Sequence, residues 1–375
     1  MNTRILVVLS LAAALAAGSA GCSVGAGGSG TFSLLLADAT TDTYNAVYVT
    51  IREVDVATDD DAWSVVSTPN RTYNLLALVN GVREQLALTD LPPGHYTQMR
   101  LIIGDLPDAG VNILSQAHPY ANYVIDSEDA YHALKIPSGL QTGIKIVYGF
   151  DINANSTTEL ILDFDASKSV VVAGSSGLYL LEPTIQVLST ALASIVRGSV
   201  TRASDLAGVK GALVSAQVYD PTAADAKDRV VVRTSTASGD DGGYEIFVAA
   251  GAYNVVAAKE DFAPAGAAVT THEDETATQD FALAAADYGE VAGSASISGA
   301  DDETFVTLSF RQAVTLGGAD VWIEVASVNV ANGGDYKVGL PAGDYAVVAS
   351  TAGRTTQEAA VTVSAGATTT HDVAF

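Results

Sequence analysis

The amino-acid sequence predicts an all-β protein made of tandem β-sandwich domains. Runs rich in valine, isoleucine, tyrosine and threonine alternate with a period of two residues, which is typical of strands with one buried face. In GIKIVYGFDI, for example, Ile144, Ile146 and Tyr148 share a face. Turn-rich breaks such as PPGH and NANS separate the runs, and helical periodicity is confined to the N-terminal segment and one turn near residues 75–79.

The first residues predict export. Arg4 precedes an apolar run at residues 5–17, which is too short to span a bilayer but suits the core of a signal peptide. Small residues follow, and then comes Cys22, the only cysteine of the 375-residue chain. We therefore expect a signal peptide at residues 1–21 and a mature chain that begins at Cys22. The alternative is an ordinary secretory peptide followed by an incidental cysteine.

The small residues and Cys22 resemble a bacterial lipobox, in which the cysteine becomes the lipidated N-terminus. This resemblance implies that Cys22 is acylated and that the protein is held at a membrane, since each buried methylene of an acyl chain contributes about 0.8 kcal/mol. After the lipidated cysteine, the remainder of residues 22–30 has the composition of a flexible linker. Ser23 in place of aspartate implies, by the same resemblance, sorting to the outer membrane of the cell envelope.

The first expected module covers residues 31–190. Its characteristic stretches, in chain order, are LLLADA (34–39), AVYVTIREVDV (46–56), NLLALVNG (74–81), LTDLPPGHYTQMRLII (88–103), LKIPSGLQTGIKI (134–146), LDFDASKSVVV (162–172) and GLYLLEPTIQV (177–187). Together they resemble the bacterial lipoprotein module catalogued as domain of unknown function 4382. The resemblance implies a β-sandwich in a surface lipoprotein and no known activity.

The C-terminal half contains an internal repeat at a shift of 92 residues. YEIFVAAGAYNVVAA from Tyr244 aligns without a gap with YKVGLPAGDYAVVAS from Tyr336. We therefore expect two copies of one module, at residues 193–286 and 288–375, each close to the size of a seven-strand sandwich. The stretches GSV, GVKGALVSAQV, GDDGGYEI and AAGAYNVVA resemble the carboxypeptidase regulatory-like (transthyretin-like) family. That resemblance implies an accessory β-sandwich.

Each module contains a Gly-x-Tyr turn that opens a strand. The three pairs are Gly94 and Tyr96, Gly251 and Tyr253, and Gly343 and Tyr345. We expect the glycine to supply a positive φ or a close backbone approach. The tyrosine is expected to bury its ring and to keep its hydroxyl hydrogen-bonded near the rim of the sandwich.

Acidic residues dominate the composition. Asp and Glu number 43 against 18 Lys and Arg, which gives a net charge of −25 at pH 7. This charge argues against nucleic acid and anionic lipid surfaces as partners, because both carry the same sign. It favours solubility and the attraction of cations. Proteins adapted to salt carry a similar excess, so the charge alone names no ligand.

The sequence lacks the arrangements typical of an enzyme active site. It contains no GxSxG motif, and Cys22 lies in the linker without a histidine held near it. The histidines are scattered without the spacing of zinc ligands; they are His95, His118, His132, His272 and His371. We therefore expect no catalysis and no zinc, with His95 and His371 on the solvent side of a turn and a strand.

Paired carboxylates offer one candidate metal site. In LDFD, Asp163 and Asp165 point to one face of a strand, and Asp38 ends another strand of the same module. Oxygen ligands of this kind suit Ca²⁺, and acidic loops at residues 59–61, 126–129 and 238–243 offer more of them. No loop has EF-hand spacing, and the alternative at each place is a solvated acidic surface. A hydrolase dyad of Asp163 and Asp165 is the weakest alternative.

These features predict a non-catalytic cell-envelope lipoprotein that displays three β-modules in a row for binding, adhesion or spacing at the cell surface. The expected partners are the membrane, through the lipid anchor, and a surface polysaccharide or protein. The alternative function is that of a carbohydrate-binding accessory protein. Sugar-binding faces need exposed aromatic rings, whereas Trp63 and Trp322 alternate with apolar neighbours and are expected to pack inside the sandwiches.

Overall fold

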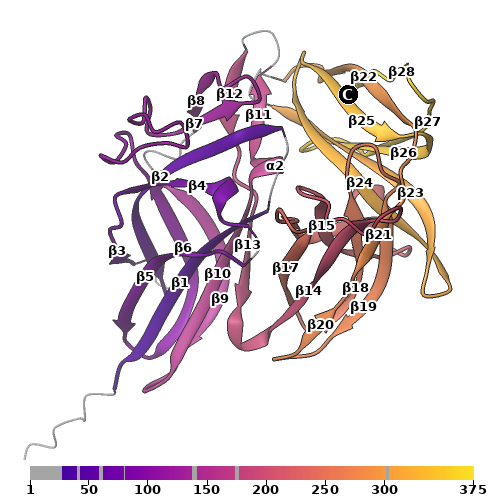
Figure 1. Ribbon diagram of the computed structural model, residues 1–375. Helices are drawn as coiled ribbons and strands as arrows, with labels where there is room; N and C mark the ends of the chain where they lie inside the picture. The colour runs from indigo at the N-terminus through magenta and orange to yellow at the C-terminus, as the bar shows by residue number, and fades with distance from the viewer. Residues whose placement is uncertain are drawn as a thin grey trace, which may run out of the picture.

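The computed structural model describes residues 28–39, 43–58, 62–79, 81–136, 142–173, 177–300 and 304–375. Strands dominate throughout these ranges, which confirms the all-β fold of tandem sandwiches (Figure 1). The expected signal peptide, Cys22, most of the linker and the acidic loop at residues 59–61 lie outside the described residues. Within the described part of the chain, no helix is long and apolar enough to cross a membrane.

The first module consists of two sheets that face each other across one core. The smaller sheet contains, in spatial order, β13 (Ile185–Ser189), β10 (Thr157–Asp165), β1 (Gly30–Ala39) and β5 (Glu84–Leu91). The facing sheet contains β12 (Leu178–Leu181), β8 (Tyr131–Lys135), β7 (Tyr123–Asp126), β2 (Tyr44–Ala57), β6 (Gly94–Ile103) and β9 (Ile144–Ile152), with β3 (Trp63–Ser67) and β4 (Arg71–Asn74) also paired to β2. Alternation places Phe32, Leu34 and Leu36 of β1 in the core, where each is fully buried.

The second and third modules have the same strand order. In the second module, one sheet contains β17 (Gly243–Ala249), β14 (Ala193–Arg202) and β20 (Thr276–Thr278), with β21 (Phe281–Leu283) also paired to β14. The other sheet contains β16 (Val230–Ala237), β15 (Leu213–Tyr219), β18 (Gly251–Ala258) and β19 (Ala265–Thr271). In the third module, one sheet contains β25 (Asp335–Pro341), β22 (Tyr288–Ser296) and β28 (Thr368–Thr370), with β29 (Val373–Ala374) also paired to β22. The other sheet contains β24 (Ala319–Ala331), β23 (Phe305–Leu316), β26 (Gly343–Ser350) and β27 (Gln357–Val363). Each strand of one module therefore has a counterpart in the other.

Equivalent side chains also make equivalent hydrogen bonds in the two copies. The backbone N–H and the hydroxyl of Ser199 both donate to Asp280 Oδ1, at 2.7 and 2.9 Å. Ser294 makes the same pair of bonds to Asp372 Oδ1, at 2.8 and 3.0 Å. In both copies the carboxylate holds the first strand of the module to the start of its last strand, which supplies the sheet with a fixed register.

The Gly-x-Tyr turns share a hydrogen bond in all three modules. The tyrosine hydroxyls donate to the backbone carbonyl four residues earlier: Tyr96 to Pro92 (3.1 Å), Tyr253 to Ala249 (2.9 Å) and Tyr345 to Pro341 (2.8 Å). The expected need for glycine is wrong at Gly94 and Gly251, since neither has a positive φ. A Cβ added at Gly94 would have no described atom within 4 Å, and one at Gly251 would lie 3.5 Å from the ring of Tyr253, an ordinary contact.

The modules are packed against one another and do not form the expected row. Strand β11 (Val170–Ala173), paired to β12, also pairs in parallel with β24 at Val172 and Val330, which joins the larger sheets of the first and third modules. Figure 1 shows the third module, in yellow, folded back beside the first. Val256 of the second module is buried in the core of the third. Only the 3₁₀ turn η2 (Thr190–Leu192) separates β13 of the first module from β14 of the second. This connection is too short to act as a flexible linker between the two modules.

Candidate functional site

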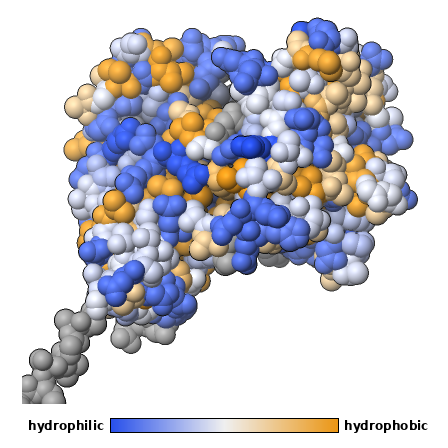
Figure 2. Space-filling model, turned by 60° about the horizontal axis from the view of Figure 1, so that its bottom comes forward, coloured by the Kyte–Doolittle hydropathy of each residue, from blue (hydrophilic) through white to orange (hydrophobic). Residues whose placement is uncertain are grey.

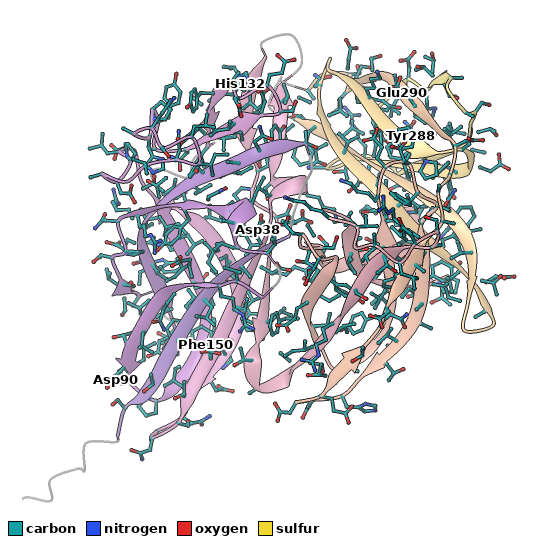
Figure 3. The ribbon with its side chains drawn as sticks, viewed as in Figure 1. Asp38, Asp90, His132, Phe150, Tyr288 and Glu290 are labelled. Carbon is teal, nitrogen blue, oxygen red and sulfur yellow. The ribbon has the colours of Figure 1, made fainter. Side chains whose placement is uncertain are left out.

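Asp38 and Asp163 lie on neighbouring strands but point in opposite directions. In the parallel pair of β1 and β10, Asp38 is opposite Phe164, and Ala37 is opposite Asp163. Successive side chains of a strand alternate between faces, so Asp38 turns toward the first module's core and Asp163 toward the second module. Asp38 Oδ1 accepts a hydrogen bond from Ala166 N at 3.0 Å, at the start of the short helix α2 (Ala166–Ser169). Figure 3 shows Asp38 near the centre of the three modules.

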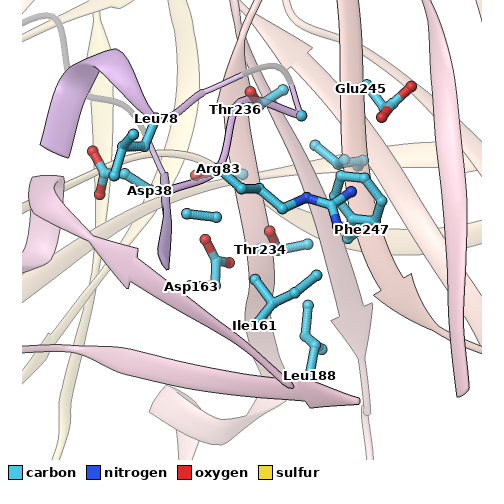
Figure 4. Close-up of a pocket in the computed structure, with 14 residues that line it drawn as sticks. Asp38, Leu78, Arg83, Ile161, Asp163, Leu188, Thr234, Thr236, Glu245 and Phe247 are labelled. Carbon is cyan, nitrogen blue, oxygen red and sulfur yellow. The ribbon is translucent and has the colours of Figure 1, made fainter. Parts of the chain in front are cut away.

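Asp163 is buried at the contact between the first and second modules. It lines a cavity of about 20 Å³, large enough for about one water molecule, together with Arg83, Thr234 and Phe247, and Asp38 borders the same cavity (Figure 4). Burial raises the pKa of Asp163 to about 7; the hydrogen bond from Thr234 opposes this rise, and the charge of Asp165 adds to it. The Arg83 guanidinium lies over the Phe247 ring, 3.7 Å from its centroid. The carboxyl therefore faces a narrow polar contact between modules.

Asp165 belongs to a different group of charges, at the contact between the first and third modules. Its side chain accepts from Lys168 N at 3.2 Å and lies 3.5 Å from Lys168 Nζ. Lys168 Nζ is also 3.7 Å from Glu324 Oε1 of the third module. Burial alone would lower the pKa of Lys168, but the carboxylates of Glu324 and Asp165 outweigh it and raise that pKa. Asp163 and Asp165 thus have separate partners, an arrangement that gives a hydrolase dyad no support.

The three carboxylates do not converge on a metal position. Among the residues that the structure describes, no group of three His, Cys, Asp or Glu side chains could hold a metal ion. In the loop at residues 126–129, Asp126 accepts from Glu128 N, Ala130 N and the ring of His132. The hydrogen bond from His132 is the largest of several causes that lower the pKa of Asp126. These oxygens build the turn, and the Ca²⁺ site gains no geometric support here.

Sequence reasoning missed the side chains that join the second and third modules. Arg311, only 4% exposed, donates to the carbonyls of Ala226 (2.6 Å), Lys227 (3.0 Å) and Val230 (3.3 Å). These carbonyls lie in and just after the turn α3 (Ala226–Arg229), where a positive charge is favourable. A signal existed in the sequence, because an arginine among the alternating apolar residues of VTLSFRQAV must either reach solvent or find a partner.

A broad hollow lies on the outer face of the third module's larger sheet, over β23, β24, β26 and β27. Its volume is about 570 Å³. Alanines form its floor, at Ala313, Ala346 and Ala360, and Trp322 lines it together with Asp344, Glu358 and Gln312. A smaller cavity of about 100 Å³ shares Trp322, Ala346 and Glu358 and extends to Tyr219 and Arg229 of the second module. We call the two cavities together the Trp322 hollow.

The expectation that both tryptophans pack inside the sandwiches is wrong, because both are half-buried. In ADVWIEV, Val321 and Ile323 take the inward positions and contact the third module's core, so Trp322 between them must point outward. Trp63 is covered on one side by the Arg100 guanidinium, 4.3 Å from the ring centroid. Arg100 Nε in turn lies 2.6 Å from Asp55 Oδ2. Trp322 is therefore the tryptophan that lines a hollow.

The first module, with its parallel β1 and β10 and its LDFD strand, can be compared with known families. Residues 29–183 match the family described as Domain of unknown function (DUF4382). The match confirms the resemblance over that range. Asp38, Asp163 and Asp165 lie inside the DUF4382 region, whereas the Trp322 hollow lies outside it. No curated protein matches the chain.

Several solved structures overlap with the chain beyond the DUF4382 region. The Bacillus anthracis TIE protein is 12% identical, with 92% of this chain and 50% of that protein covered, at a TM-score of 0.21. The Streptococcal ancillary pilin is 9% identical, with 91% of this chain and 98% of that chain covered, at a TM-score of 0.20. The shaft pilin SpaA from Lactobacillus rhamnosus GG is 7% identical, with 49% of this chain and 96% of that chain covered, also at a TM-score of 0.20. The chain thus spans half the length of the TIE protein. TM-scores this low do not show a shared arrangement of modules, and nothing about the role of this chain follows from them.

Proposed function

We propose that this protein is a non-catalytic lipoprotein of the cell envelope, anchored through Cys22 in the outer membrane, and that it presents three packed β-modules for binding at the cell surface. The observation that carries the proposal is the position of β1, which begins at Gly30, the last residue of the linker. A linker of residues 22–30 spans at most about 30 Å when extended. An acyl anchor on Cys22 would therefore keep the first module close to the membrane.

The packing of the modules favours binding or adhesion over spacing. A spacer gains reach when its modules follow one another in line, whereas here the third module returns to the side of the first. The module contacts are made by buried polar groups such as Gln217 and Arg311, which fix one arrangement. On the face drawn in Figure 2, hydrophilic and apolar side chains are interspersed, as expected for a solvated surface.

The anchor is tested by metabolic labelling with a fatty-acid analogue, comparing the wild-type chain with Cys22→Ala. We expect label on the wild-type protein and its recovery with outer membranes, and an unlabelled Cys22→Ala protein in the soluble fraction. Ser23→Ala serves as a matched control that should keep the label. A soluble, unlabelled wild-type protein would overturn the proposal.

A carbohydrate-binding accessory protein is the second candidate. The resemblance of the second and third modules to carboxypeptidase regulatory-like accessory domains gives a general reason. The specific reason is the Trp322 hollow, in which an aromatic ring and two carboxylates line a floor of small side chains. Binding of an isolated polysaccharide to the full chain tests this candidate.

A further inference from the structure

We infer that the Trp322 hollow binds a saccharide without negative charge, with the indole of Trp322 stacked on a sugar ring. The inference rests on the proposed binding role and gives that role a location and a ligand class. It does not depend on the anchor at Cys22, and the two are measured by different experiments.

The shape of the hollow follows from the strand register. On the outer face, Trp322 of β24 is paired with Ala313 of β23, and Ala346 of β26 is paired with Ala360 of β27. Three small side chains therefore lie beside the one large ring, and the space above them is a hollow of about 570 Å³. This volume is in the range that small-molecule sites occupy. A flat ring can lie against the indole without displacing any core side chain.

The polar groups of the hollow are suited to hydroxyls. Asp344 Oδ1 accepts from Thr362 Oγ1 at 2.6 Å, and Glu358 Oε2 lies 3.5 Å from an Arg229 nitrogen. These contacts hold each carboxylate in place, and a carboxylate has several acceptor positions for the hydroxyl hydrogens of a sugar.

The charges around the hollow disfavour an anionic ligand. Asp344 brings a negative charge to the lining, in a chain whose net charge is −25, and the charge of Glu358 is balanced by Arg229. Of the two arginines that line the smaller cavity, Arg311 already donates to three backbone carbonyls and to Ser309, and Arg229 is paired with Glu358. A neutral or amino sugar therefore fits, while an acidic polysaccharide would be repelled.

The position of the hollow favours a sugar over a peptide. An extended peptide that joins a sheet does so at an unpaired edge, where backbone groups are free to bond. The hollow lies on the face of a four-strand stretch, over β23 and β26, whose backbone groups are paired on both sides. Recognition there depends on side chains, and a stacked aromatic ring with hydrogen-bonding carboxylates recognises a ring that has an apolar face and polar edges.

The experiment uses the full chain purified in detergent, in a Trp63→Phe background that leaves Trp322 as the single tryptophan. Cello-, xylo-, manno- and chito-oligosaccharides are titrated while Trp322 emission is recorded. We expect a saturable change with at least one of these probes and none with polygalacturonate. Trp322→Ala, tested by affinity electrophoresis with the corresponding polysaccharide, should lose binding by about tenfold or more. Trp63→Phe alone should bind as the wild type does.

Three results would overturn the inference: no probe of the panel binds, Trp322→Ala binds as well as the wild type, or Trp322-dependent binding is found for polylysine and for no sugar. Trp322→Phe, which keeps an aromatic face, should retain part of the affinity. Thermal melting of each variant checks that the fold is intact, which we expect because Trp322 points away from the core. If the wild-type protein is labelled at Cys22 but binds no sugar, the saccharide site alone is refuted. If it binds sugar but carries no label, the anchor alone is refuted.

Discussion

Gln217 and Glu324 exchange two hydrogen bonds across the contact between the second and third modules. Gln217 Nε2 donates to the carbonyl of Glu324 at 2.7 Å, and Glu324 N donates to Gln217 Oε1 at 2.8 Å. The side-chain amide thus pairs with backbone groups as a neighbouring strand would. Gln217 is 1% exposed, so water cannot replace these bonds.

We expect Gln217→Leu to destabilise the protein by about 2–4 kcal/mol, because both backbone groups of Glu324 would be left buried without a partner. Chemical denaturation monitored by circular dichroism gives the free energy of unfolding. Gln85→Leu, at an exposed position of β5, is the matched control and should change that free energy by less than about 0.5 kcal/mol. Equal losses in both variants would contradict the role assigned to Gln217.

The buried carboxyl of Asp163 predicts a pH dependence. Its pKa rises from 3.8 to about 7 on folding, so between these values the folded state binds more protons than the unfolded state. Stability should therefore be highest near pH 4 and fall as the pH rises toward 8, by roughly 4 kcal/mol at most from this group. Asp163→Asn should flatten the slope of unfolding free energy against pH over this window.

Thr234→Val provides the second arm of this test. The Thr234 hydroxyl donates to Asp163 and favours its charged form, so its removal should raise the pKa of Asp163 further and extend the loss of stability to higher pH, with a larger total loss. A wild-type slope that Asp163→Asn leaves unchanged would show that other groups cause the pH dependence.

Gly242 is a position where only glycine fits. Its φ is +84°, and an added Cβ would lie 2.3 Å from the carbonyl oxygen of Val200. Gly242→Ala should therefore destabilise by about 2 kcal/mol or more, since both the backbone angle and the contact become unfavourable. Gly94→Ala is the control, and thermal melting should show a shift for the first substitution and almost none for the second.

The sheets and their cores were predictable from the sequence because a two-residue period identifies the buried face of each strand. Phe32, Leu34 and Leu36 illustrate this, as does the repeat, whose matching turns at Tyr244 and Tyr336 have hydroxyls bonded to equivalent carbonyls of Gln279 and His371. Both kinds of signal lie within short stretches of chain.

The packing of the modules was not predictable, since it depends on single polar residues whose partners are far away in the sequence. Lys168 and Glu324 are an example, and so is the hydrogen bond from the Asn329 amide to the carbonyl of Lys168. The Trp322 hollow was missed for a related reason. It depends on alanines from three strands, and a sequence does not show which small residues become neighbours.

Calcium should have little effect on this protein. Asp38 accepts a hydrogen bond from Ala166 N, Asp163 faces the second module and Asp165 pairs with Lys168, and among the described residues no three such side chains could hold a metal ion. We expect the same melting midpoint in millimolar Ca²⁺ and in excess chelator. A clear rise with Ca²⁺ would reveal a site outside these three carboxylates or a rearrangement of the module contacts.

Lys168 joins the first and third modules through its two carboxylate partners, Asp165 and Glu324. Variants of Lys168 and Glu324 together should distinguish the free energy lost with the ion pair from that lost by leaving a carboxylate unpaired. In Lys168→Met, Asp165 and Glu324 would face each other without a cation, so the protein should lose stability. Breaking a fully buried pair costs about 3–5 kcal/mol. The loss here should be smaller, because the Lys168 side chain is 22% exposed. Adding Glu324→Gln should recover part of that loss, because one of the two unpaired charges is removed while its hydrogen-bonding capacity is kept. Denaturation of the two single variants and the double variant completes the cycle. Strictly additive effects would show that Lys168 and Glu324 are not coupled and that the first and third modules are held together by other contacts.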